Sequence, residues 1–530
     1  MTLNLSGSHF QSNLASSSLD DMGAGGAFAL LSGSRASVTG DVFKNNKASP
    51  IIRTTSMNSP TGGISGYGGA IYVSESSIFV NNCHILRNSC ESTNGDAGDC
   101  KGGGIYIDMP LEHARKKSES EFYETIFEFN SALAAYERNG HGISQSTNSG
   151  RGGAVFVYRA QPIFDKCVFN SNQALSGMGG TTASGGAVEL SFSNDLEEDE
   201  IVLSSIGTRF VACNFTRNVV GDDSLSSRRA TSRSFGKGSI TSQTGRGGAV
   251  SAVASRVSFH SSTLHRNMAF ASADASLPSF AGGIFLDELS KCDIYDSSLE
   301  DNHVINGMGT DLVSIEVQSG SNNGEQTKGQ GKHLSKLVFE RSTLRTNVQP
   351  FSDASSQDIF SHMTAVPSIL LLGDTINFGV GNTFGPGSSI LVAGTGSEVG
   401  RSILGVDVQL RETKLILDVL SPTNNLSVVA WNASVTFSSL MDGPRPEIPR
   451  LSNLGLIGGS VITRDGIVIE GDAGFIEGTI VSHPVTGRGL FEVRGDLQAG
   501  YTEEPPNRRD WVCLCYTIPL SLQCVYSCNL

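Results

Sequence analysis

Two short motifs alternate between residues 10 and 347, and their regular spacing limits the possible folds more strongly than any other feature of the chain. The first motif is a pair of glycines followed by an apolar run, as in GRGGAV at Gly150 to Val155 and again at Gly245 to Val250. The second is an aromatic or aliphatic residue, two variable positions and an asparagine, as in FNSN from Phe169. Self-similarity of this kind is the signature of a repeat architecture.

The distances between the motifs separate a constant arm of the repeat from a variable one. The glycine pairs are Gly25 and Gly26, Gly68 and Gly69, Gly102 and Gly103, Gly152 and Gly153, Gly185 and Gly186, Gly247 and Gly248, and Gly282 and Gly283. The second motif supplies Phe10 and Asn13, Phe43 and Asn46, Ile85 and Asn88, Phe127 and Asn130, Phe169 and Asn172, Phe215 and Asn218, Leu264 and Asn267, Leu299 and Asn302, and Leu344 and Asn347. From first glycine to large residue the spacing is 17 or 18, except for 25 and 30 at Gly102 and Gly185, whereas the return distance from asparagine to glycine varies from 12 to 29.

The constant arm has the composition of β-strands and tight turns. The segment AIYVSESSIFVNNCHILRN from Ala70 to Asn88 contains β-branched and aromatic runs with a period of two, separated by Ser and Asn. We expect two or three strands of about five residues in each repeat, with successive coils stacked at the strand spacing of ~4.8 Å. The sequence therefore predicts an all-β fold, a parallel β-helix (solenoid) with long loop insertions.

Each motif has an expected place in such a coil. The large residue of the second motif would point inward and stack on its equivalents in neighbouring coils. The asparagine amide would bond to the coil above or below, as in a side-chain ladder. The glycines would lie where the chain bends sharply or approaches the next backbone, because glycine has no Cβ and tolerates positive φ.

The alternation of GGA followed by Ile, Leu or Val with FxxN resembles the repeat of the polymorphic outer membrane proteins of chlamydiae. The resemblance covers roughly residues 10 to 347 and implies a secreted or surface-displayed, right-handed β-helix of the pectin-lyase-like fold that acts in adhesion or recognition. Similar repeats occur in surface proteins of other bacteria and of microbial eukaryotes. MTLNLSGSHFQSNL contains no readable signal peptide, and no C-terminal outer-membrane barrel is evident. Because FQSN arrives without its glycine half, we expect a chain that begins in mid-coil.

We divide the chain into a β-helix at residues 1–348, further coils without the FxxN motif at 349–505, and a cysteine-containing tail at 506–530. Strand-like runs such as SILLLGDTINFGVGNTF support the second division, with a separate β-sandwich as the alternative. Residues 511–530 carry no charge, but Pro519, Ser521 and Gln523 argue against a membrane span. A weak anchor and an out-of-frame tail both remain open.

The cysteines have two expected roles. Cys83, Cys167 and Cys213 each stand two residues before the large residue of the second motif, so they should face inward with it. They are read as buried small side chains, although Cys167 and Cys213 lie in consecutive repeats and could be bridged. Cys90 and Cys100 flank a polar loop and are the better candidates for a local disulfide. Cys513 and Cys515 with Cys524 and Cys528 lack zinc spacing.

Charge and motifs exclude some function classes. The formal net charge of −14 and pI near 5.2 argue against a nucleic-acid partner, which calls for a basic face. The sequence suggests no cofactor, metal or catalytic residue. The sequons at Asn4, Asn214, Asn425 and Asn432 permit N-glycosylation in a eukaryotic source.

The fold class requires a search for polysaccharide chemistry, because inverting hydrolysis uses two separated carboxylates. Asp222 and Asp223 with His141 are the hydrolase candidates. His141 comes before the two aspartates in the chain, and this order argues against the role. Asp96, Asp99 and Asp108 are close enough in sequence to suggest a lyase calcium cluster, with solvated loop carboxylates as the alternative.

Two charged loops could contact a ligand. SNDLEEDE at 193–200 is acidic, and the arm at 219–246 carries five basic residues, namely Arg228, Arg229, Arg233, Lys237 and Arg246. We expect a non-catalytic extracellular or cell-surface protein that acts in adhesion or recognition through loops on a rigid stem. Its partner would be a host or matrix protein or a glycan, and it would reach a membrane only through an anchor not seen in this sequence. The alternatives are a polysaccharide lyase or glycoside hydrolase, and a purely structural surface or matrix protein.

Overall fold

The computed structural model describes the strands and tight turns of the repeat and of the segment that follows it. The described residues are 2–16, 23–49, 65–92, 99–109, 120–134, 149–176, 182–192, 207–221, 244–271, 278–287, 290–315, 336–345, 366–372, 375–378, 382–385, 388–393, 408–411, 414–418, 427–431, 434–438, 450–451, 453–463, 466–471, 473–476, 478–482, 490–493, 497–500, 512–518 and 521–527. They form strands and turns, with no helix among them. The chain divides into a first unit, Met1–Cys292 with Ser297–Val313 and Gln349–Val366, and a second unit that contains the remainder.

In the first unit each coil contributes one strand to each of five parallel sheets, which we number in the order that the chain visits them. Sheet 1 contains β4 (Gly23–Ala24), β9 (Gly66–Tyr67), β14 (Cys100–Lys101), β19 (Gly150–Arg151), β24 (Thr182–Ser184), β29 (Thr244–Arg246), β34 (Ser279–Phe280) and β39 (Gly307–Met308). Sheet 2 contains β5 (Phe28–Leu30), β10 (Ile71–Ser74), β15 (Ile105–Asp108), β20 (Val155–Tyr158), β25 (Val188–Ser191), β30 (Val250–Val253) and β35 (Ile284–Asp287). Sheet 3 contains β1 (Thr2–Ser6), β6 (Arg35–Thr39), β11 (Ser77–Asn81), β16 (Glu121–Tyr123), β21 (Ile163–Asp165), β26 (Thr208–Val211) and β31 (Arg256–His260).

The last two sheets complete the coil. Sheet 4 contains β2 (His9–Gln11), β7 (Val42–Lys44), β12 (His84–Leu86), β17 (Ile126–Glu128), β22 (Val168–Asn170), β27 (Asn214–Thr216), β32 (Thr263–His265) and β37 (Ser298–Glu300). Sheet 5 contains β3 (Leu14–Ala15), β8 (Lys47–Ala48), β13 (Ser89–Ser92), β18 (Ser131–Ala134), β23 (Gln173–Leu175), β28 (Val219–Val220), β33 (Met268–Phe270) and β38 (His303–Ile305). The strands β36 (Lys291–Tyr295) and β40 (Leu312–Ile315) are each divided between the two units.

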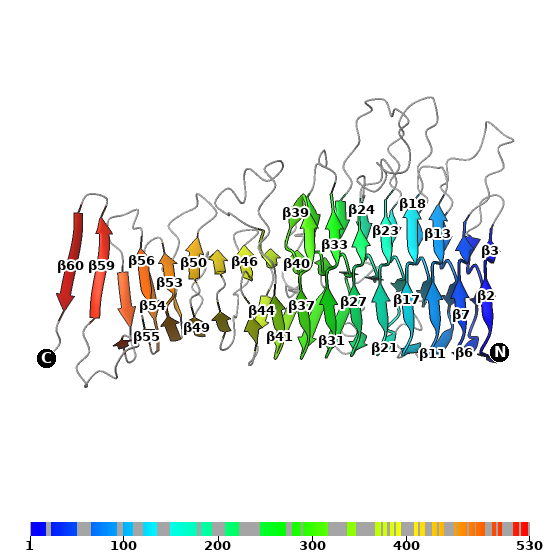
Figure 1. The fold of residues 1–530 in the computed structure, drawn as a ribbon, viewed down its shortest axis with the longest axis horizontal. Helices are drawn as coiled ribbons and strands as arrows, with labels where there is room; N and C mark the ends of the chain where they lie inside the picture. Colours follow the sequence, from blue (N-terminus) through cyan, green and yellow to red (C-terminus); the bar gives the residue numbers. More distant parts are fainter. Residues whose placement is uncertain are drawn as a thin grey trace, which may run out of the picture. The chain divides into compact units, whose positions relative to one another are not determined.

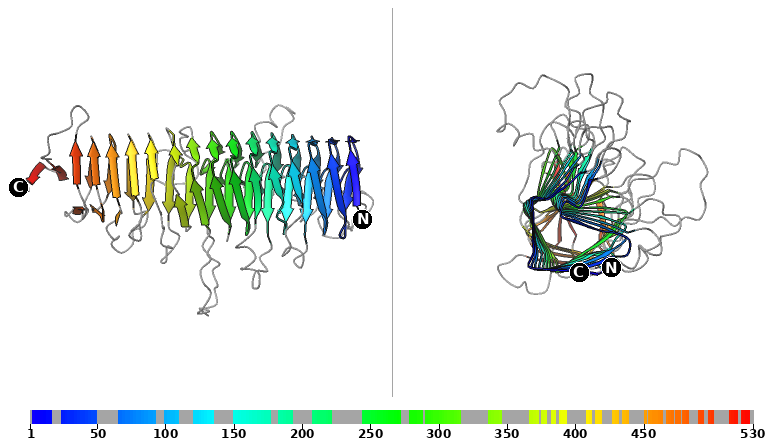
Figure 2. Two further views of the ribbon diagram at one scale, coloured as in Figure 1. Left: turned by 90° about the horizontal axis from the view of Figure 1, so that it is seen from below. Right: turned by 90° about the vertical axis from the view of Figure 1, so that its right-hand side faces the viewer.

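This arrangement confirms the predicted parallel β-helix. Equivalent strands of successive coils pair in register, so that Ile85 of β12 lies between Phe43 of β7 and Phe127 of β17. In Figure 1 the labelled strands β7, β17 and β27 of sheet 4 follow one another along one row, and the right-hand view of Figure 2 looks along the stacked coils. The expectation of two or three strands per repeat is wrong, because a complete coil contains five strands, most of only two to five residues.

Phenylalanine columns fill the core between sheets 2, 3 and 4. The rings of Phe127, Phe169 and Phe215 are fully buried and stack with centroid distances of 4.7 and 4.6 Å. A second column from sheet 3 continues through Phe164 and Phe210 at 5.1 Å, and the two columns meet edge to face. Because every coil places the same kind of side chain at the same height, the apolar surface is buried continuously along the stack.

Sheets 1 and 5 pack against each other as a narrow double layer, which we call the fin. Its interior is a cluster of small buried side chains, namely Cys90, Cys100, Ala132, Ala174, Ala183, Val220, Ala269, Val304 and Val366. In Figure 1 labelled strands of the two sheets, including β13, β18, β24 and β33, lie in the upper row. The fin was not predicted from the sequence, since its strands are too short to show a period of two.

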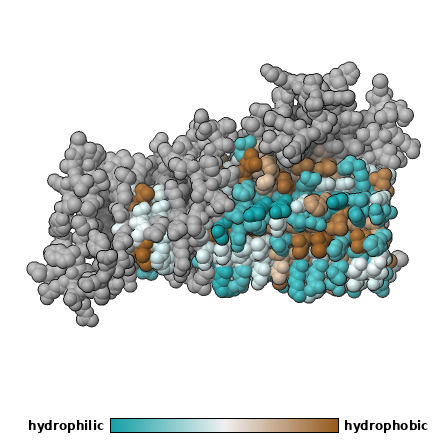
Figure 3. Space-filling view, viewed as in Figure 1, coloured by the Kyte–Doolittle hydropathy of each residue, from teal (hydrophilic) through white to brown (hydrophobic). Residues whose placement is uncertain are grey.

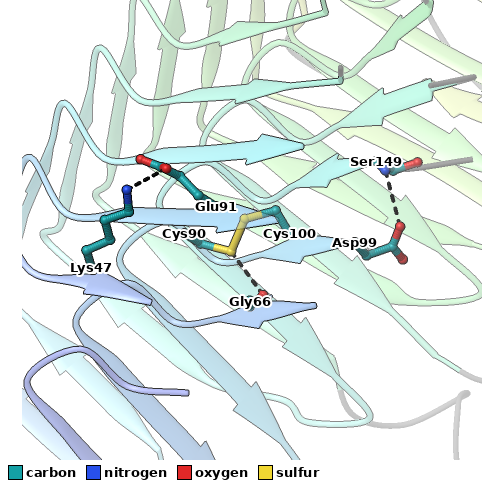
Figure 4. Close-up of a disulfide and its surroundings, with 7 residues drawn as sticks. All are labelled: Lys47, Gly66, Cys90, Glu91, Asp99, Cys100 and Ser149. Atoms are coloured by element: carbon teal, nitrogen blue, oxygen red, sulfur yellow. Dashed lines mark hydrogen bonds and ion pairs between the residues drawn. A yellow bond between two sulfur atoms is a disulfide. The ribbon is translucent and has the colours of Figure 1, made fainter. Parts of the chain in front are cut away.

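A disulfide joins the two layers of the fin, which confirms the predicted Cys90–Cys100 bridge (Figure 4). The other candidate pair, Cys167 and Cys213, consists of free thiols. We expect reduction of the bridge, or the double change Cys90→Ala with Cys100→Ala, to lower the free energy of unfolding by about 2–3 kcal/mol, because a loop of this length is released in the unfolded chain. Urea melts with and without a reductant would measure the change. The double variant should show no further response to the reductant, and an equal response in parent and variant would contradict the assignment.

An asparagine ladder runs along the turn between sheets 4 and 5. The Asn172 amide nitrogen donates to the Asn218 side-chain oxygen at 3.0 Å and to the Phe127 carbonyl at 3.0 Å. The side-chain oxygen of Asn172 accepts from the backbone and side-chain nitrogens of Asn130, both at 3.0 Å. The same pattern links every ladder member from Asn13 to Asn302. Asn302 then donates to the buried Asp311, while the predicted member Asn347 lies outside the described residues.

A second ladder of small polar side chains occupies the turn between sheets 3 and 4. Cys83, Cys167 and Cys213 are buried there, facing inward as predicted, and each thiol donates to the backbone of the preceding coil, as Cys167 does to the Phe122 carbonyl. Burial raises the pKa of the Cys83 and Cys167 thiols, which keeps them in the protonated form that can donate. Ser262 makes the equivalent bond to the Phe210 carbonyl. The same position holds the small polar side chains Asp41 and Thr125 in other coils, so these cysteines are not merely small apolar side chains.

The glycine pair marks the corner between sheets 1 and 2. The first glycine has positive φ, for example +64° at Gly152, and the second leaves no space for a side chain. A Cβ on Gly153 would lie 2.1 Å from the Gly186 carbonyl oxygen and 2.6 Å from backbone atoms of Gln173. The chain therefore needs glycine where the fin and the core meet.

The last glycine motif is displaced by one residue from its expected register. Pairing of β30 with β35 places Ile284 opposite Val250, so that Ala281 and not Gly282 occupies the position of Gly247. Ala281 accordingly has a φ of 55°. The following coil uses Gly309, with a φ of 69°, at this position, in a GTD sequence that does not match the motif.

The long spacings after Gly102 and Gly185 arise from insertions between sheets 2 and 3, at 109–120 and 192–207.

The second unit consists mainly of parallel strands. One sheet has the order β43 (Ile369–Leu372), β46 (Ser389–Ala393), β48 (Lys414–Asp418), β50 (Ser434–Ser438), β53 (Ser460–Thr463) and β56 (Thr479–Ser482). Another has the order β42 (Thr343–Arg345), β45 (Thr383–Phe384), β47 (Val408–Arg411), β49 (Ser427–Trp431), β52 (Asn453–Ile457), β55 (Ala473–Ile476) and β58 (Leu497–Gly500). The strands β41 (Lys336–Glu340) and β44 (Thr375–Phe378) pair, as do β51 (Arg450–Leu451), β54 (Gly466–Ile469) and β57 (Leu490–Val493). The parallel pairing of these strands differs from the antiparallel pairing of a β-sandwich. In the tail, β59 (Val512–Ile518) and β60 (Ser521–Ser527) form an antiparallel hairpin.

Candidate functional site

Three of the five connections in each coil of the first unit have constant length, and two vary. Three residues always join sheet 1 to sheet 2, and two residues always join sheet 3 to sheet 4 and sheet 4 to sheet 5. The connection from sheet 5 to sheet 1 ranges from one residue, between Ile305 and Gly307, to 23, between Val220 and Thr244. The connection from sheet 2 to sheet 3 ranges from two residues, between Ser74 and Ser77, to 16, between Ser191 and Thr208. The variable connections therefore border the two strands that meet at the glycine corner.

The side chains of these two strands that point away from the coil interior pack against one another across the corner, where most of those from sheet 2 are buried. Sheet 1 contributes Tyr67, Lys101, Arg151, Ser184, Arg246 and Phe280, and sheet 2 contributes Tyr72, Tyr106, Phe156, Glu189, Ser251 and Phe285. We call this set of residues the corner site. In Figure 3, hydrophilic residues cover most of the described part of one face, and hydrophobic residues lie among them in short rows.

Aromatic rings and cations alternate in the corner site. Tyr72, Tyr106 and Phe156 stack with centroid distances of 5.2 and 5.5 Å, and Tyr67 meets Tyr106 edge to face at 4.9 Å. The Lys101 ammonium lies 5.6 Å from the ring centroids of Tyr67 and Phe156. Contacts of this kind are stronger when the cation is partly removed from water, as it is here, where 21% of the Lys101 side chain is exposed.

The charged groups of the corner site are largely neutralised by one another. Arg151 donates through Nε to Glu189 Oε1 at 2.8 Å and also through Nη2, and Ser184 Oγ donates to the other oxygen of Glu189. Glu189 is fully buried, so these donors replace its water shell. Arg246 lies over the Phe285 ring and pairs with Asp287 at 3.1 Å. Both arginine side chains remain partly exposed, at 24% and 29%.

Asp108, at the end of β15, has a different environment. Burial raises the pKa of its carboxyl, Arg159 lowers it, and the charge of Glu75 raises it further. Burial and the Asp108 charge also raise the pKa of the neighbouring Tyr106 phenol. Asp99 lies on the other side of the corner, at the start of β14, where it pairs with Lys101 at 3.5 Å and accepts from the Ser149 amide (Figure 4). Asp99 and Asp108, two of the three aspartates suggested as a calcium cluster, are therefore separated by a strand, the glycine corner and a second strand.

The other sequence candidates divide between described and undescribed residues. Asp96, His141, Asp222 and Asp223, the acidic loop at 193–200 and the basic residues 228–237 lie outside the described residues, as do Asn425 and Asn432. Asn4 and Asn214 are exposed on outward faces of β1 and β27. Within the described ranges no group of three or more His, Cys, Asp or Glu could hold a metal ion. The corner site itself was missed, although a basic or aromatic residue before four of the glycine pairs was a readable signal.

A small pocket opens beside the corner site where sheet 2 passes to sheet 3. Its lining includes Val157, Leu190, Phe192 and the buried Gln161, whose Oε1 has no hydrogen-bond partner. The enclosed space has room for about one water molecule, which would satisfy that oxygen. The pocket is therefore too small for an organic ligand.

Comparisons with known proteins leave the family open. No family model matches the sequence, and no curated protein matches it either. In the part of the chain that the structure describes, no helical segment has the length and hydropathy needed to cross a membrane.

Proposed function

We propose that this chain is a non-catalytic extracellular or cell-surface recognition protein, in which a β-helical stem presents the corner site and its bordering connections to a ligand. The observation that carries the proposal is the distribution of length variation. Connections elsewhere in the coil are constant, whereas both connections that border the corner site vary from coil to coil. Variable segments on a rigid scaffold are where binding sites are usually built.

The resemblance to polymorphic outer membrane protein repeats adds adhesion to a host or matrix protein, or to a glycan, as the biological setting of this proposal. The paired charges of the corner site support binding over catalysis. Both oxygens of the Glu189 carboxylate accept hydrogen bonds, from Arg151 and Ser184, and Asp287 is paired with Arg246. Hydrolysis would require two suitably separated carboxylates that are free to act.

Shortening one variable connection tests the proposal. We expect replacement of the 23 residues between Val220 and Thr244 by six, the length between Leu175 and Thr182, to leave the melting temperature within a few degrees, because loop length contributes weakly to stability. Affinity for a ligand identified on an array of matrix proteins and glycans should fall about tenfold or more.

The control is His84→Ala, which changes an exposed residue on sheet 4 and should leave binding unchanged. A purely structural protein would bind nothing on the array. Release of reducing ends from pectin, alginate or chitin that is abolished by Asp108→Asn would replace the proposal by an enzymatic one, for which the raised pKa of Asp108 is the favourable observation.

A further inference from the structure

The strand β27 presents a complete sequon, Asn214-Phe215-Thr216, to solvent. Asn214 and Thr216 are two residues apart in the strand and lie on its outward face, while Phe215 between them is fully buried in the core. The Asn214 side chain is exposed, and its Oδ1 accepts a hydrogen bond from Thr216 Oγ1 at 2.7 Å. The asparagine and the hydroxyl that define the sequon are therefore both outside the coil.

The amide nitrogen of Asn214 differs from the amide nitrogens of the asparagine ladder. In the ladder, Asn172 is buried and its Nδ2 donates to the Phe127 carbonyl and to the Asn218 side-chain oxygen. No hydrogen bond within the described part of the chain involves Asn214 Nδ2. A new bond at this nitrogen would therefore break none of the described hydrogen bonds of the fold.

The surroundings of Asn214 leave space for a bulky group. Two-residue turns join sheet 4 to sheets 3 and 5 in the coils of the first unit, so no variable connection begins or ends at sheet 4. The residues in register with Asn214 are Val168 in the preceding coil and Thr263 in the following coil. Both side chains are short, and the Asn214 side chain remains exposed between them.

We propose that Asn214 carries an N-linked oligosaccharide when a eukaryotic cell secretes the chain. The proposal rests on the extracellular setting of the proposed function and adds a modification to it. In the transfer, Asn214 Nδ2 loses a proton and forms a bond to the anomeric carbon of a polyprenyl-pyrophosphate oligosaccharide. The bond from that carbon to the pyrophosphate oxygen breaks, and the pyrophosphate leaves with the electron pair.

The disulfide of the fin agrees with this setting. Cys90 and Cys100 are bridged, and disulfides form in oxidising compartments such as the lumen of the endoplasmic reticulum. That lumen is also where a secreted chain receives N-linked oligosaccharides. Whether the oligosaccharide is added before or after β27 pairs with its neighbours, the folded chain has to hold the modified nitrogen in solvent, and the exposed face of sheet 4 does so.

Secretion of the full chain from a eukaryotic cell line, behind a cleavable signal sequence, tests the proposal. Peptide-N-glycosidase should remove an oligosaccharide and convert Asn214 to aspartate, which mass spectrometry of the peptides locates. Asn214→Gln and Thr216→Ala should each remove the oligosaccharide at this position, whereas Thr216→Ser keeps the hydroxyl and should retain it. The control is Asn82→Gln, which changes an exposed asparagine outside any sequon and should leave the modification unchanged.

Two results would overturn the proposal. The first is a secreted, folded chain in which Asn214 is unmodified, and the second is modification of Asn214 that persists in Thr216→Ala. Either result leaves the recognition function standing, because binding to the array is measured separately. A chain that is glycosylated at Asn214 but binds nothing on the array would support the modification and refute the recognition function.

Discussion

Replacing Gly153 by alanine is expected to prevent the chain from folding, or to lower the free energy of unfolding by about 4 kcal/mol or more. The added Cβ would stand 2.1 Å from the Gly186 carbonyl oxygen and 2.6 Å from the backbone of Gln173. Both obstacles are main-chain atoms, one in the turn between β24 and β25 and the other on β23, so no side-chain rotation can relieve the contact. Separating them would break the pairing of neighbouring coils, on which a repeat fold depends for its stability.

Gly474→Ala is the matched control, because no atom lies within 4 Å of the position that its Cβ would occupy. That variant should match the parent or be slightly more stable, since alanine restricts the unfolded chain. Far-UV circular dichroism and urea melts of the two variants provide the comparison. A Gly153→Ala protein that melts within a few degrees of the parent would show that the corner can open, and would refute the role given to the second glycine.

The stacking of the coils could be predicted from the sequence, because the large residue and the asparagine of the second motif recur at the same position in each coil. Phe127, Phe169 and Phe215 recur with the asparagine three residues later, and each pair satisfies apolar burial and amide bonding together. The same reasoning placed Cys83, Cys167 and Cys213 inward but not their role as donors. That role depends on the carbonyls of the preceding coil, which sequence spacing does not reveal.

The fin and the corner site could not be predicted with the same reasoning. Fin strands such as β14 and β19 have two residues, and a period cannot be read from two positions. The displacement of the motif at Gly282 was missed for a related reason. The first position of the corner is defined by strand pairing and by a positive φ, and the type of residue alone does not reveal it. At Ala281 a residue other than glycine adopts the left-handed conformation. The partners of Arg151 and Arg246 lie in the following coil, across connections whose length varies.

Asn172→Asp is expected to destabilise the fold by about 3–5 kcal/mol at pH 7, although it changes only one amide group into a carboxylate. The carboxylate can still accept from Asn130, but it can no longer donate to the Phe127 carbonyl or the Asn218 oxygen, each 3.0 Å from the present amide nitrogen. The variant therefore places a fully buried negative charge against two oxygens. Every other ladder member remains intact, so the loss of unfolding free energy comes from the hydrogen bonds of one ladder position.

The sign of the pH dependence distinguishes this cause from a simple packing defect. A buried carboxyl beside oxygens has a folded-state pKa above its unfolded value of about 4. Its protonated form is favoured in the fold, so stability is present below the unfolded pKa and is lost as the pH rises through the folded pKa. Urea melts should show a larger deficit relative to the parent at pH 7 than at pH 4. Asn82→Asp, at an exposed turn, should stay within about 0.5 kcal/mol of the parent at both pH values. A deficit for Asn172→Asp that does not change with pH would mean that the ladder acts through shape, and that its hydrogen bonds contribute little.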